Sequence, residues 1–234
     1  MKILVIIPAY NEEESIEGVV QELIRTKIDV DYIIINDCSS DETESICKKN
    51  KFNYLSLPVN LGIGGGVQTG YCYASENKYD IAIQMDGDGQ HNAEFLRELI
   101  DPIINQEANM VIGSRFIEKK GFQSSGLRRF GISFLKKLIR VCCGVSIQDT
   151  TSGFRACDKN LIDFFARSYA QDYPEPEAII AAVLNGYRIK EVPVLMRERQ
   201  GGDSSISAFK SVYYMIKVSL AIVIYRLGFM AKRR

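Results

Sequence analysis

The sequence predicts an α/β fold in which a mostly parallel sheet is flanked by helices. Short apolar runs alternate with stretches of helical periodicity along most of the 234 residues. The first run, residues 3–7, is apolar at every position, which is typical of a strand covered on both faces. Polar or glycine-containing segments follow several runs, where parallel strands end and ligands bind. This alternation favours βαβ units.

The first half of the chain contains alternating expected strands and helices. Pro8 ends the first run, and apolar residues at helical spacing follow it to about residue 26. Ser40 or Asp41 can cap the next helix, which has acidic residues in its first turn. A third helix follows the glycine-rich segment 62–66 and extends to about residue 77. The strands are expected at residues 3–7, 31–36, 54–57 and 81–85.

The second half continues the pattern with less regular spacing. One stretch, residues 149–156, is polar and contains glycine, and we expect it to form a loop before a helix. Residues 172–177 precede a further helix, with Glu177 in or near its first turn, where the helix dipole favours a carboxylate. The remaining expected elements are helices at 93–106, 127–144 and about 207–230, and strands at 110–112 and 187–194.

Composition excludes several classes of protein. With 46% hydrophobic and 25% charged residues, the chain has material for an ordinary globular core. Its formal net charge is zero, so no global field recruits nucleic acid. The six cysteines lack C-x-x-C spacing and accompany a single histidine, which favours reduced thiols in a cytosolic protein over a zinc site. No apolar stretch reaches the roughly 18 residues of a transmembrane helix.

Two carboxylates directly follow the apolar run at residues 81–85. Asp86 and Asp88 are two residues apart, so in an extended chain they point to the same side. Such a pair suits Mg²⁺ or Mn²⁺, which also takes waters and substrate phosphates as ligands. The alternative is an acidic β-turn that caps the strand, because Asp and Gly are common turn residues.

The other polar strand ends predict a composite site with this pair. Tyr10-Asn11-Glu12, Asp37 and the glycine segment 62–66 all follow expected parallel strands, so they are expected at one sheet edge. The glycine segment lacks the third glycine of G-x-G-x-x-G and the Gly-Lys-Ser/Thr of a P-loop. It is either a plain flexible loop or a close approach to a nucleotide.

Two helices carry basic residues beside apolar ones. The helix at 127–144 includes Arg128, Arg129 and Lys137, a combination that suits an anionic lipid surface or a partner groove. A surface helix packed on the domain is the alternative. The last helix is largely apolar but contains Lys217 near its middle, which favours lying in a membrane interface over spanning the bilayer. We therefore expect a catalytic domain at 1–204 and an amphipathic helix with a basic tail at 205–234.

Taken in order, these segments resemble a family 2 glycosyltransferase of GT-A fold, and especially the polyprenyl-phosphate and dolichyl-phosphate sugar synthases. The resemblance covers nearly the whole chain. It is carried by Pro8-Ala9-Tyr10-Asn11-Glu12, Asn36-Asp37, Ser40-Asp41, Asp86-Gly87-Asp88-Gly89-Gln90-His91, Gly113-Ser114-Arg115, Ser152-Gly153-Phe154-Arg155, Glu191-Val192-Pro193-Val194, and Arg199 with Gly202, Ser204 and Ser205. The final loop departs from the pattern, because Ser205 stands where the synthases commonly have Lys.

The resemblance implies roles for individual residues. Asp37 would hydrogen-bond the base of a nucleotide-sugar donor, and Asp86, Asp88 and Gln90 would hold Mg²⁺ or Mn²⁺ at the diphosphate. Arg199 would reach a donor phosphate. The residues implied around the nucleotide are Pro8, Tyr10, Glu12, Asp37, Gly62 and Asp86, and those implied at a polyprenyl-phosphate acceptor are Arg115, Arg129 and Ser133. One helical face can present both Arg129 and Ser133.

The implied chemistry is inverting transfer of one sugar, with a UDP-sugar favoured and GDP-mannose as a possibility. A phosphate acceptor is already ionised, whereas a sugar hydroxyl on a lipid-linked saccharide needs a base, for which Glu177 or Glu175 is the candidate and Asp88 a weaker one. A non-catalytic nucleotide-sugar-binding scaffold is a further alternative. Arg115, Arg155 and Arg199 argue against it, since a binder has no need of so many phosphate-binding groups. The expected location is the cytoplasmic face of a membrane, held by lipid or by a small membrane-protein partner.

Overall fold

The computed structural model describes residues 1–118, 126–198 and 208–232, and side chains within these ranges except at 126–130, 208–214 and 232. Its centre is a seven-stranded sheet in the order β3-β2-β1-β4-β6-β5-β7. The strands are β1 (Ile3–Ala9), β2 (Asp31–Asn36), β3 (Tyr54–Ser56), β4 (Ile81–Gln84), β5 (Met110–Ser114), β6 (Arg155–Asp158) and β7 (Ile189–Pro193). All seven residues of β1 are buried, as its continuous apolar run predicts.

The sheet is mostly parallel, and this prediction is confirmed. Strand β1 pairs in parallel with both β2 and β4, and β5 pairs in parallel with β7. The exception is β6, which runs antiparallel between β4 and β5. The expectation of a loop over all of 149–156 is therefore wrong at its end. The strand begins at Arg155, a charged residue that gives no apolar signal, yet its side chain is fully buried.

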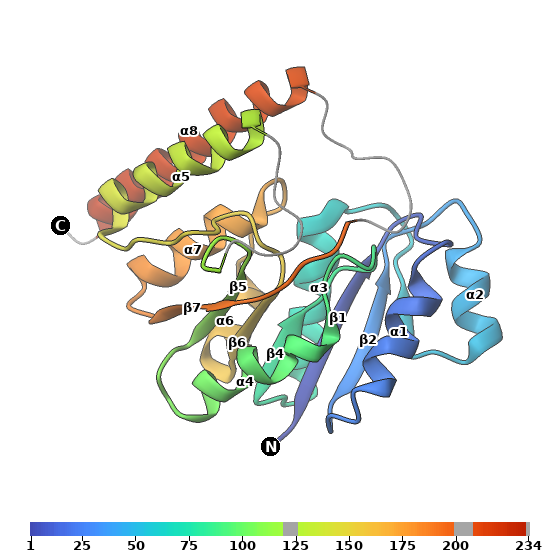
Figure 1. The fold of residues 1–234 in the computed structure, drawn as a ribbon. Helices are drawn as coiled ribbons and strands as arrows, with labels where there is room; N and C mark the ends of the chain where they lie inside the picture. The colour runs from blue at the N-terminus through green and yellow to red at the C-terminus, as the bar shows by residue number, and fades with distance from the viewer. Residues whose placement is uncertain (119–125, 199–207, 233–234) are drawn as a thin grey trace.

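Helices cover both faces of the sheet (Figure 1). The buried side chains of α1 (Ile16–Arg25), α2 (Thr43–Asn50) and α4 (Leu96–Ile104) pack with one face. A short 3-10 turn at Ala93–Phe95 precedes α4. The other face is covered by α3 (Gly62–Glu76), α5 (Gly126–Cys143), α6 (Lys159–Arg167), α7 (Pro174–Leu184) and α8 (Ala208–Lys232). These two apolar layers position the sheet edge where β1, β2 and β4 end.

The glycine-rich segment is helical rather than a loop, because it forms the first turns of α3. A Cβ on Gly64 would lie 2.2 Å from the carbonyl oxygen of Gln171, and one on Gly70 would lie 2.2 Å from Cγ2 of Ile6. The glycines therefore let α3 pack closely on β1 and on the segment after α6. Tertiary packing overrides the poor helix propensity of glycine here.

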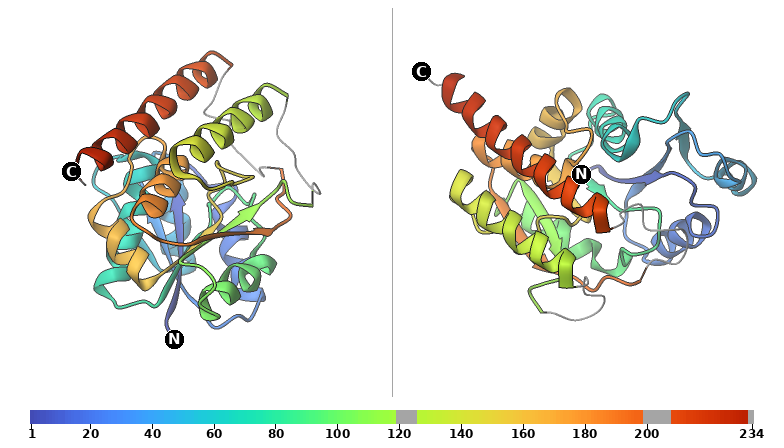
Figure 2. Two further views of the ribbon diagram at one scale, coloured as in Figure 1. Left: turned by 90° about the vertical axis from the view of Figure 1, so that its left-hand side faces the viewer. Right: turned by 90° about the horizontal axis from the view of Figure 1, so that it is seen from above.

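Helices α5 and α8 lie side by side across one end of the molecule (Figure 2). Leu135 and Ile139 of α5 are buried with Val218 and Ile222 of α8 in one core cluster. None of the helices within the described ranges is long and apolar enough to cross a membrane. The expected boundary between residues 204 and 205 falls in 199–207, outside the described residues.

Candidate active site

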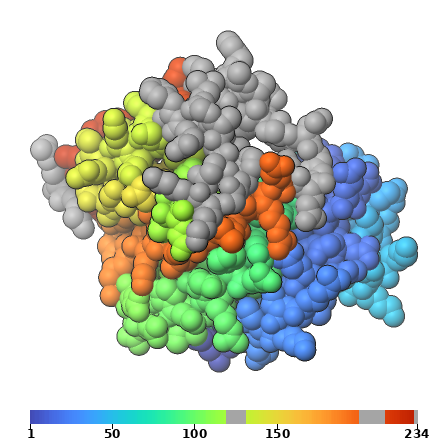
Figure 3. All heavy atoms as spheres, in the orientation of Figure 1, coloured from blue at the N-terminus to red at the C-terminus, as the bar shows by residue number. Residues whose placement is uncertain are grey.

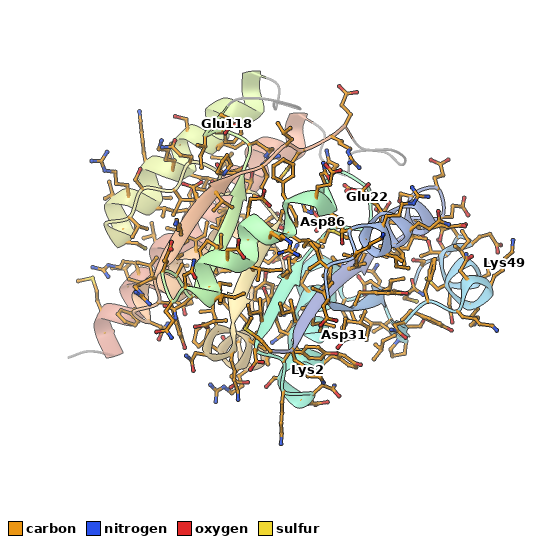
Figure 4. The ribbon with its side chains drawn as sticks, turned by 60° about the horizontal axis from the view of Figure 1, so that its bottom comes forward. Lys2, Glu22, Asp31, Lys49, Asp86 and Glu118 are labelled. Atoms are coloured by element: carbon orange, nitrogen blue, oxygen red, sulfur yellow. The ribbon has the colours of Figure 1, made fainter. Side chains whose placement is uncertain are left out.

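A pocket of about 420 Å³ opens at the carboxyl ends of β1, β2 and β4. Asp86 lies at this end of the sheet, and Lys2 and Asp31 lie at the opposite end (Figure 4). The structure brings together all six residues predicted to surround a nucleotide, together with Asp88. The pocket is lined by Pro8, Ala9, Tyr10, Glu12, Asp37, Asn60, Gly62, Ile63, Gly66, Asp86, Gly87 and Asp88.

Asp37 joins the end of β2 to the start of α3. Its side chain is almost fully buried, and Oδ1 accepts a hydrogen bond from the backbone amide of Leu61 at 2.7 Å. Its carbonyl oxygen accepts from Nδ2 of Asn60 at 3.1 Å, and Oδ1 of Asn60 accepts from the amide of Gly62 at 3.1 Å. Gly62 has a φ of +74°, which favours glycine. These bonds fix the wall of the pocket formed by 60–63.

The loop after β1 is fixed to the loop after β2. Asn11 adopts a left-handed conformation with a φ of 55°, and its Oδ1 accepts a hydrogen bond from the amide of Ser40 at 2.8 Å. The amide of Glu12 donates to Oγ1 of Thr43 at 2.9 Å. Tyr10 remains half-exposed beside the pocket. The predicted nucleotide-binding loop therefore has a defined backbone.

Gln84, His91 and Gly153 surround the carboxylate of Asp86 on the side away from the pocket. Nε2 of Gln84 donates to Oδ1 of Asp86 at 3.0 Å. Nδ1 of His91 accepts from the Asp86 amide at 2.9 Å, while Nε2 of His91 lies 3.7 Å from Oδ2. A Cβ on Gly153 would lie 2.9 Å from Oδ2 of Asp86, so glycine is required for this close approach. Asp88 is buried, and its Oδ1 accepts from the Gln90 amide at 3.0 Å.

The segment after β7 lies against the turn that carries the acidic pair. The amide of Arg197 donates to the carbonyl oxygen of Gln90 at 2.9 Å, and His91 forms a β-bridge with Met196. Nε2 of Gln90 donates to the carbonyl oxygen of Arg197 at 3.4 Å. In Figure 3 this segment, coloured orange, lies on the surface against green and blue parts of the chain. Gln90 is thus beside Asp88, and its role as a metal ligand stays a prediction.

The acidic pair fits a divalent cation that is shared with a ligand. Within the residues that the structure describes, no group of three or more His, Cys, Asp or Glu side chains could hold a metal ion by itself. Mg²⁺ is usually held by one or two carboxylates together with waters and substrate phosphates. The carboxylates of Asp86 and Asp88 are hard oxygen donors on the wall of one pocket, so they fit this mode of binding.

The two candidate base carboxylates face different surroundings. Burial raises the pKa of the Glu175 carboxyl, an effect that the charge of Arg155 opposes; the charges of Asp86 and Arg115 act on it more weakly. Burial also raises the pKa of Glu177, whose charged neighbours are Asp172 and Lys217 of α8. The charge of Asp86 thus acts on the carboxyl of Glu175. Which carboxylate acts as a base stays a prediction.

Arg155 is a structural residue rather than an exposed phosphate-binding group. It is fully buried, and its Nε and Nη2 donate to the carbonyl oxygen of Ser152 at 2.9 and 2.6 Å. Its Nη1 donates to the carbonyl oxygen of Glu175 at 3.0 Å. The sequence interpretation that counted Arg155 among phosphate-binding arginines needs this correction. Arg155 holds the loop around Gly153 and the start of α7 together behind Asp86.

The predicted acceptor residues are only partly described. Arg115 follows β5, is buried and forms a two-pronged ion pair with Asp149, with Nε to Oδ2 and Nη2 to Oδ1 both at 2.7 Å. Ser133 is exposed on α5. The backbone of Arg129 lies in α5, but its side chain lies outside the described residues. The whole of Arg199, which was predicted at a donor phosphate, also lies outside them. The roles of all four stay predictions.

Comparison with known families identifies the class of protein. The sequence profile described as "Glycosyl transferase family 2" matches residues 4–165. The chain belongs to glycosyl transferase family 2. This glycosyltransferase is 31% identical to the UDP-N-acetylglucosamine--dolichyl-phosphate N-acetylglucosaminyltransferase of Methanococcus voltae, over 95% of this chain and 98% of the relative. It is 26% identical to the polyprenol monophosphomannose synthase of Mycolicibacterium smegmatis, over 92% of this chain and 85% of that relative.

The fold is also that of solved glycosyltransferases. Glucosyl-3-phosphoglycerate synthase from Mycobacterium tuberculosis, in complex with Mn²⁺, UDP-glucose and phosphoglyceric acid, superposes with a TM-score of 0.73. The two chains are 20% identical, and the match covers 97% of this glycosyltransferase and 80% of that structure. The predicted GT-A fold is confirmed.

Sequence reasoning missed several residues that support the site of this glycosyltransferase. Gln84 lies inside an apolar run, and Asp149 lies 34 residues after its partner Arg115. Asn60 precedes the glycine segment, but no role was predicted for its side chain. A signal existed for Gln84, because a polar residue inside an otherwise apolar strand needs a hydrogen-bond partner. No local pattern indicates the pairing of Asp149 with Arg115.

Proposed function

We propose that this glycosyltransferase moves one sugar from a nucleotide sugar, with a UDP-sugar favoured, to a membrane-borne polyprenyl phosphate. One observation carries the proposal: the predicted nucleotide-binding residues and the acidic pair line a single pocket. The named relatives act on dolichyl phosphate or are polyprenol monophosphomannose synthases, which supports the same acceptor class here.

The donor's nucleoside would lie between the loop after β1 and the wall formed by 60–63. The carboxylate of Asp37 would accept a hydrogen bond from a ring N–H of the base, a group that both uracil and guanine possess. Tyr10 and Pro8 would cover the nucleoside, and Glu12 lies on the same wall. A base bound in this way would leave the diphosphate beside Asp86 and Asp88.

A divalent cation, Mg²⁺ or Mn²⁺, would be held by Asp86 and Asp88, with Gln90 as a further ligand. When bound, it would neutralise charge on the leaving diphosphate. The chain's own part is orientation, because Gln84, His91 and Gly153 hold the Asp86 carboxylate in one direction. Arg199 would add a positive charge at a donor phosphate.

Transfer would be an inverting displacement at the anomeric carbon. A phosphate oxygen of the acceptor forms the new bond to that carbon, the bond from carbon to the diphosphate oxygen breaks, and its electron pair leaves with the nucleoside diphosphate. A phosphate monoester is largely ionised near neutral pH, so this route needs no strong base. Arg115, Arg129 and Ser133 would bind the acceptor phosphate, since the planar arginine group suits phosphate oxygens.

A second enzymatic route, extension of a lipid-linked saccharide through a hydroxyl, is favoured by one observation. Glu175 is partly buried at the start of α7, where its carbonyl oxygen accepts from Arg155, and the charges of both Asp86 and Arg115 act on its carboxyl. A carboxylate there could take the proton from an acceptor hydroxyl. Glu177, acted on by Lys217 and Asp172, is the other candidate. The scaffold alternative loses its support, because the chain belongs to a transferase family.

Helices α5 and α8 would hold the enzyme at the cytoplasmic face of an anionic membrane. Apolar side chains of α8 at helical spacing are exposed on one face: Ile216, Leu220, Val223, Ile224, Leu227 and Met230. On α5, Phe134 and Val141 are exposed together with Lys137 and Arg140. Apolar insertion combined with basic residues suits anionic lipids. A small membrane-protein partner is the alternative outcome of the binding test.

Calorimetric titration with UDP and with GDP, each with and without Mn²⁺, tests the donor half of the proposal. We expect binding of one nucleotide that is strengthened at least tenfold by Mn²⁺ in the wild type and not in Asp88→Ala. Asp29→Ala is the control, since Asp29 is exposed and is absent from the residues that line the pocket. Binding of neither nucleotide, or equal metal dependence in Asp88→Ala, would contradict the proposed site.

A further inference from the structure

A buried ion pair joins Arg115, the residue directly after β5, to Asp149. Arg115 is 5% exposed and Asp149 is 0% exposed, so both charges are withdrawn from water. A buried ion pair is often no more stabilising than well-packed apolar residues, because desolvation offsets the attraction. Stability alone therefore gives a weak reason for this pair.

The geometry of the pair fixes the direction of the guanidinium. Oδ2 and Oδ1 of Asp149 accept from Nε and Nη2 of Arg115 at 2.7 Å each, and Oδ2 also accepts from the Arg115 amide at 3.2 Å. Oγ1 of Thr151 accepts from Nη2 at 3.1 Å. Two parallel bonds to one carboxylate define the plane of an arginine side chain. The edge of the guanidinium that carries Nη1 consequently faces away from Asp149.

Asp149 is itself held by a neighbouring strand. Oε1 of Glu191 accepts from the Asp149 amide at 2.8 Å, and Oε2 accepts from the Gln148 amide at 2.7 Å. Glu191 lies on β7, which pairs directly with β5, the strand that ends just before Arg115. Glu191, Asp149 and Arg115 thus form a chain of contacts across two adjacent strands.

Strands β4 and β5 both run antiparallel to β6, so Asp86 after β4 and Arg115 after β5 lie at the same end of the sheet. The charge of Arg115 acts on the carboxyl of Glu175, as does that of Asp86. We propose that Asp149, held by Glu191, is a positioning residue that orients Arg115 toward the acceptor phosphate. The inference rests on the proposed function, and it assigns to Asp149 and Glu191 a role in acceptor binding rather than in donor binding. Functional groups need such support to keep a productive geometry.

The test compares Asp149→Asn, Glu191→Gln and Thr151→Val with the wild type. Three quantities are measured: the melting temperature, the affinity for UDP or GDP, and the affinity for a short-chain polyprenyl phosphate by calorimetry. We expect Asp149→Asn to weaken acceptor binding about tenfold or more, as for loss of a hydrogen bond to a charged group, while nucleotide affinity stays within about twofold. Arg115→Ala combined with Asp149→Asn should weaken acceptor binding no further than Arg115→Ala alone, since the two residues act as one unit.

Glu107→Gln is the control, because Glu107 forms an exposed ion pair with Lys190, the residue that precedes Glu191 on β7. If Asp149→Asn lowers only the melting temperature and binds the acceptor as the wild type does, the pair is structural and the inference is wrong. If Asp149→Asn does not fold, Thr151→Val and Glu191→Gln decide by the same comparison of acceptor and nucleotide affinities. A wild type that binds nucleotide but no polyprenyl phosphate would overturn the proposed acceptor and this inference together, whereas failure of the variants alone would overturn only the inference.

Discussion

The carboxylate of Asp37 accepts a hydrogen bond from the backbone amide of Leu61 at 2.7 Å, and this contact joins the end of β2 to the start of α3. Asp37 therefore has two separable functions in the proposed site. It fixes the wall at 60–63, and it would present a carboxylate oxygen to the base. Two substitutions at this position can distinguish them.

Asp37→Asn keeps an oxygen for the Leu61 amide but places an NH₂ group where the second carboxylate oxygen was. We expect the KM for the donor to rise about tenfold or more, because a charge-assisted hydrogen bond to the base is lost. Asp37→Ala should in addition lower the free energy of unfolding by about 1–3 kcal/mol. Donor kinetics and chemical denaturation measure the two effects. Normal donor KM in Asp37→Asn would contradict the assigned contact.

The glycines of α3 predict opposite effects on stability. In Gly70→Ala the new Cβ would meet Cγ2 of Ile6 at 2.2 Å, so we expect a loss of about 1–3 kcal/mol in unfolding free energy. In Gly66→Ala the nearest atom is 3.9 Å away, and we expect a gain of about 0.5–1 kcal/mol from helix propensity. Denaturant unfolding of both variants measures this. Equal destabilisation of the two would contradict the packing of α3 on β1.

The strands of the sheet were easier to predict from the sequence than the glycine-rich start of α3. The strands at 3–7 and 31–36 were predictable because burial on both faces leaves an unbroken apolar run. The helical state of 62–66 was not, because it depends on the close approach of Ile6 and Gln171. Strand β6 was missed for a related reason, since its first residue is a buried arginine.

Glu175 predicts a pH dependence of stability. Burial raises the folded-state pKa of its carboxyl above the ordinary 4.5, so its contribution to stability is greatest below that pH and is lost as the pH rises through the folded pKa. Glu175→Gln removes a carboxyl whose ionisation is disfavoured by its partial burial. We expect the variant to gain stability relative to the wild type as the pH rises above 4.5, as measured by urea unfolding without metal.

The control for this experiment is Glu44→Gln. Glu44 is on α2, and its contact with Lys48 lowers the pKa of its carboxyl, so the sign of the dependence is opposite. A stability difference for Glu175→Gln that does not change with pH would show that the Glu175 carboxyl ionises as freely in the folded chain as in the unfolded one.

The exposed face of α8 predicts lipid binding. Leu220 and Ile224 are each 58% exposed, and so is Ile24 on α1, which gives a matched control. We expect Leu220→Glu with Ile224→Glu to weaken sedimentation with anionic phospholipid vesicles at least tenfold, because each buried apolar side chain contributes about 1.5–3 kcal/mol. Ile24→Glu should sediment as the wild type does.

Pure lipid vesicles, which contain no membrane protein, distinguish binding to lipid from binding to a membrane-protein partner. Unchanged sedimentation of the α8 double variant would contradict docking through this face. Binding to native membranes but not to pure lipid vesicles of any charge would indicate a membrane-protein partner instead.

The candidate site was predictable to the extent that its residues follow strands. Tyr10, Asp37 and Asp86 each come directly after a parallel strand, so topology alone brings them to one edge. The contacts behind them were not predictable. Asp149 and Arg115 are far apart along the chain and come together because β5, which ends before Arg115, pairs antiparallel with β6, which begins after Asp149.

The most direct test of the central claim is a transfer assay with UDP-, GDP- and dTDP-sugars, a short-chain polyprenyl phosphate and Mn²⁺ or Mg²⁺. Mass spectrometry would follow the formation of sugar-phosphate-polyprenol. We predict product from donors of one nucleoside, lost in Asp88→Ala and in Arg129→Ala. Donor binding without this product, but with transfer to a lipid-linked saccharide that Glu175→Gln or Glu177→Gln abolishes, would contradict the phosphate acceptor and establish the hydroxyl route.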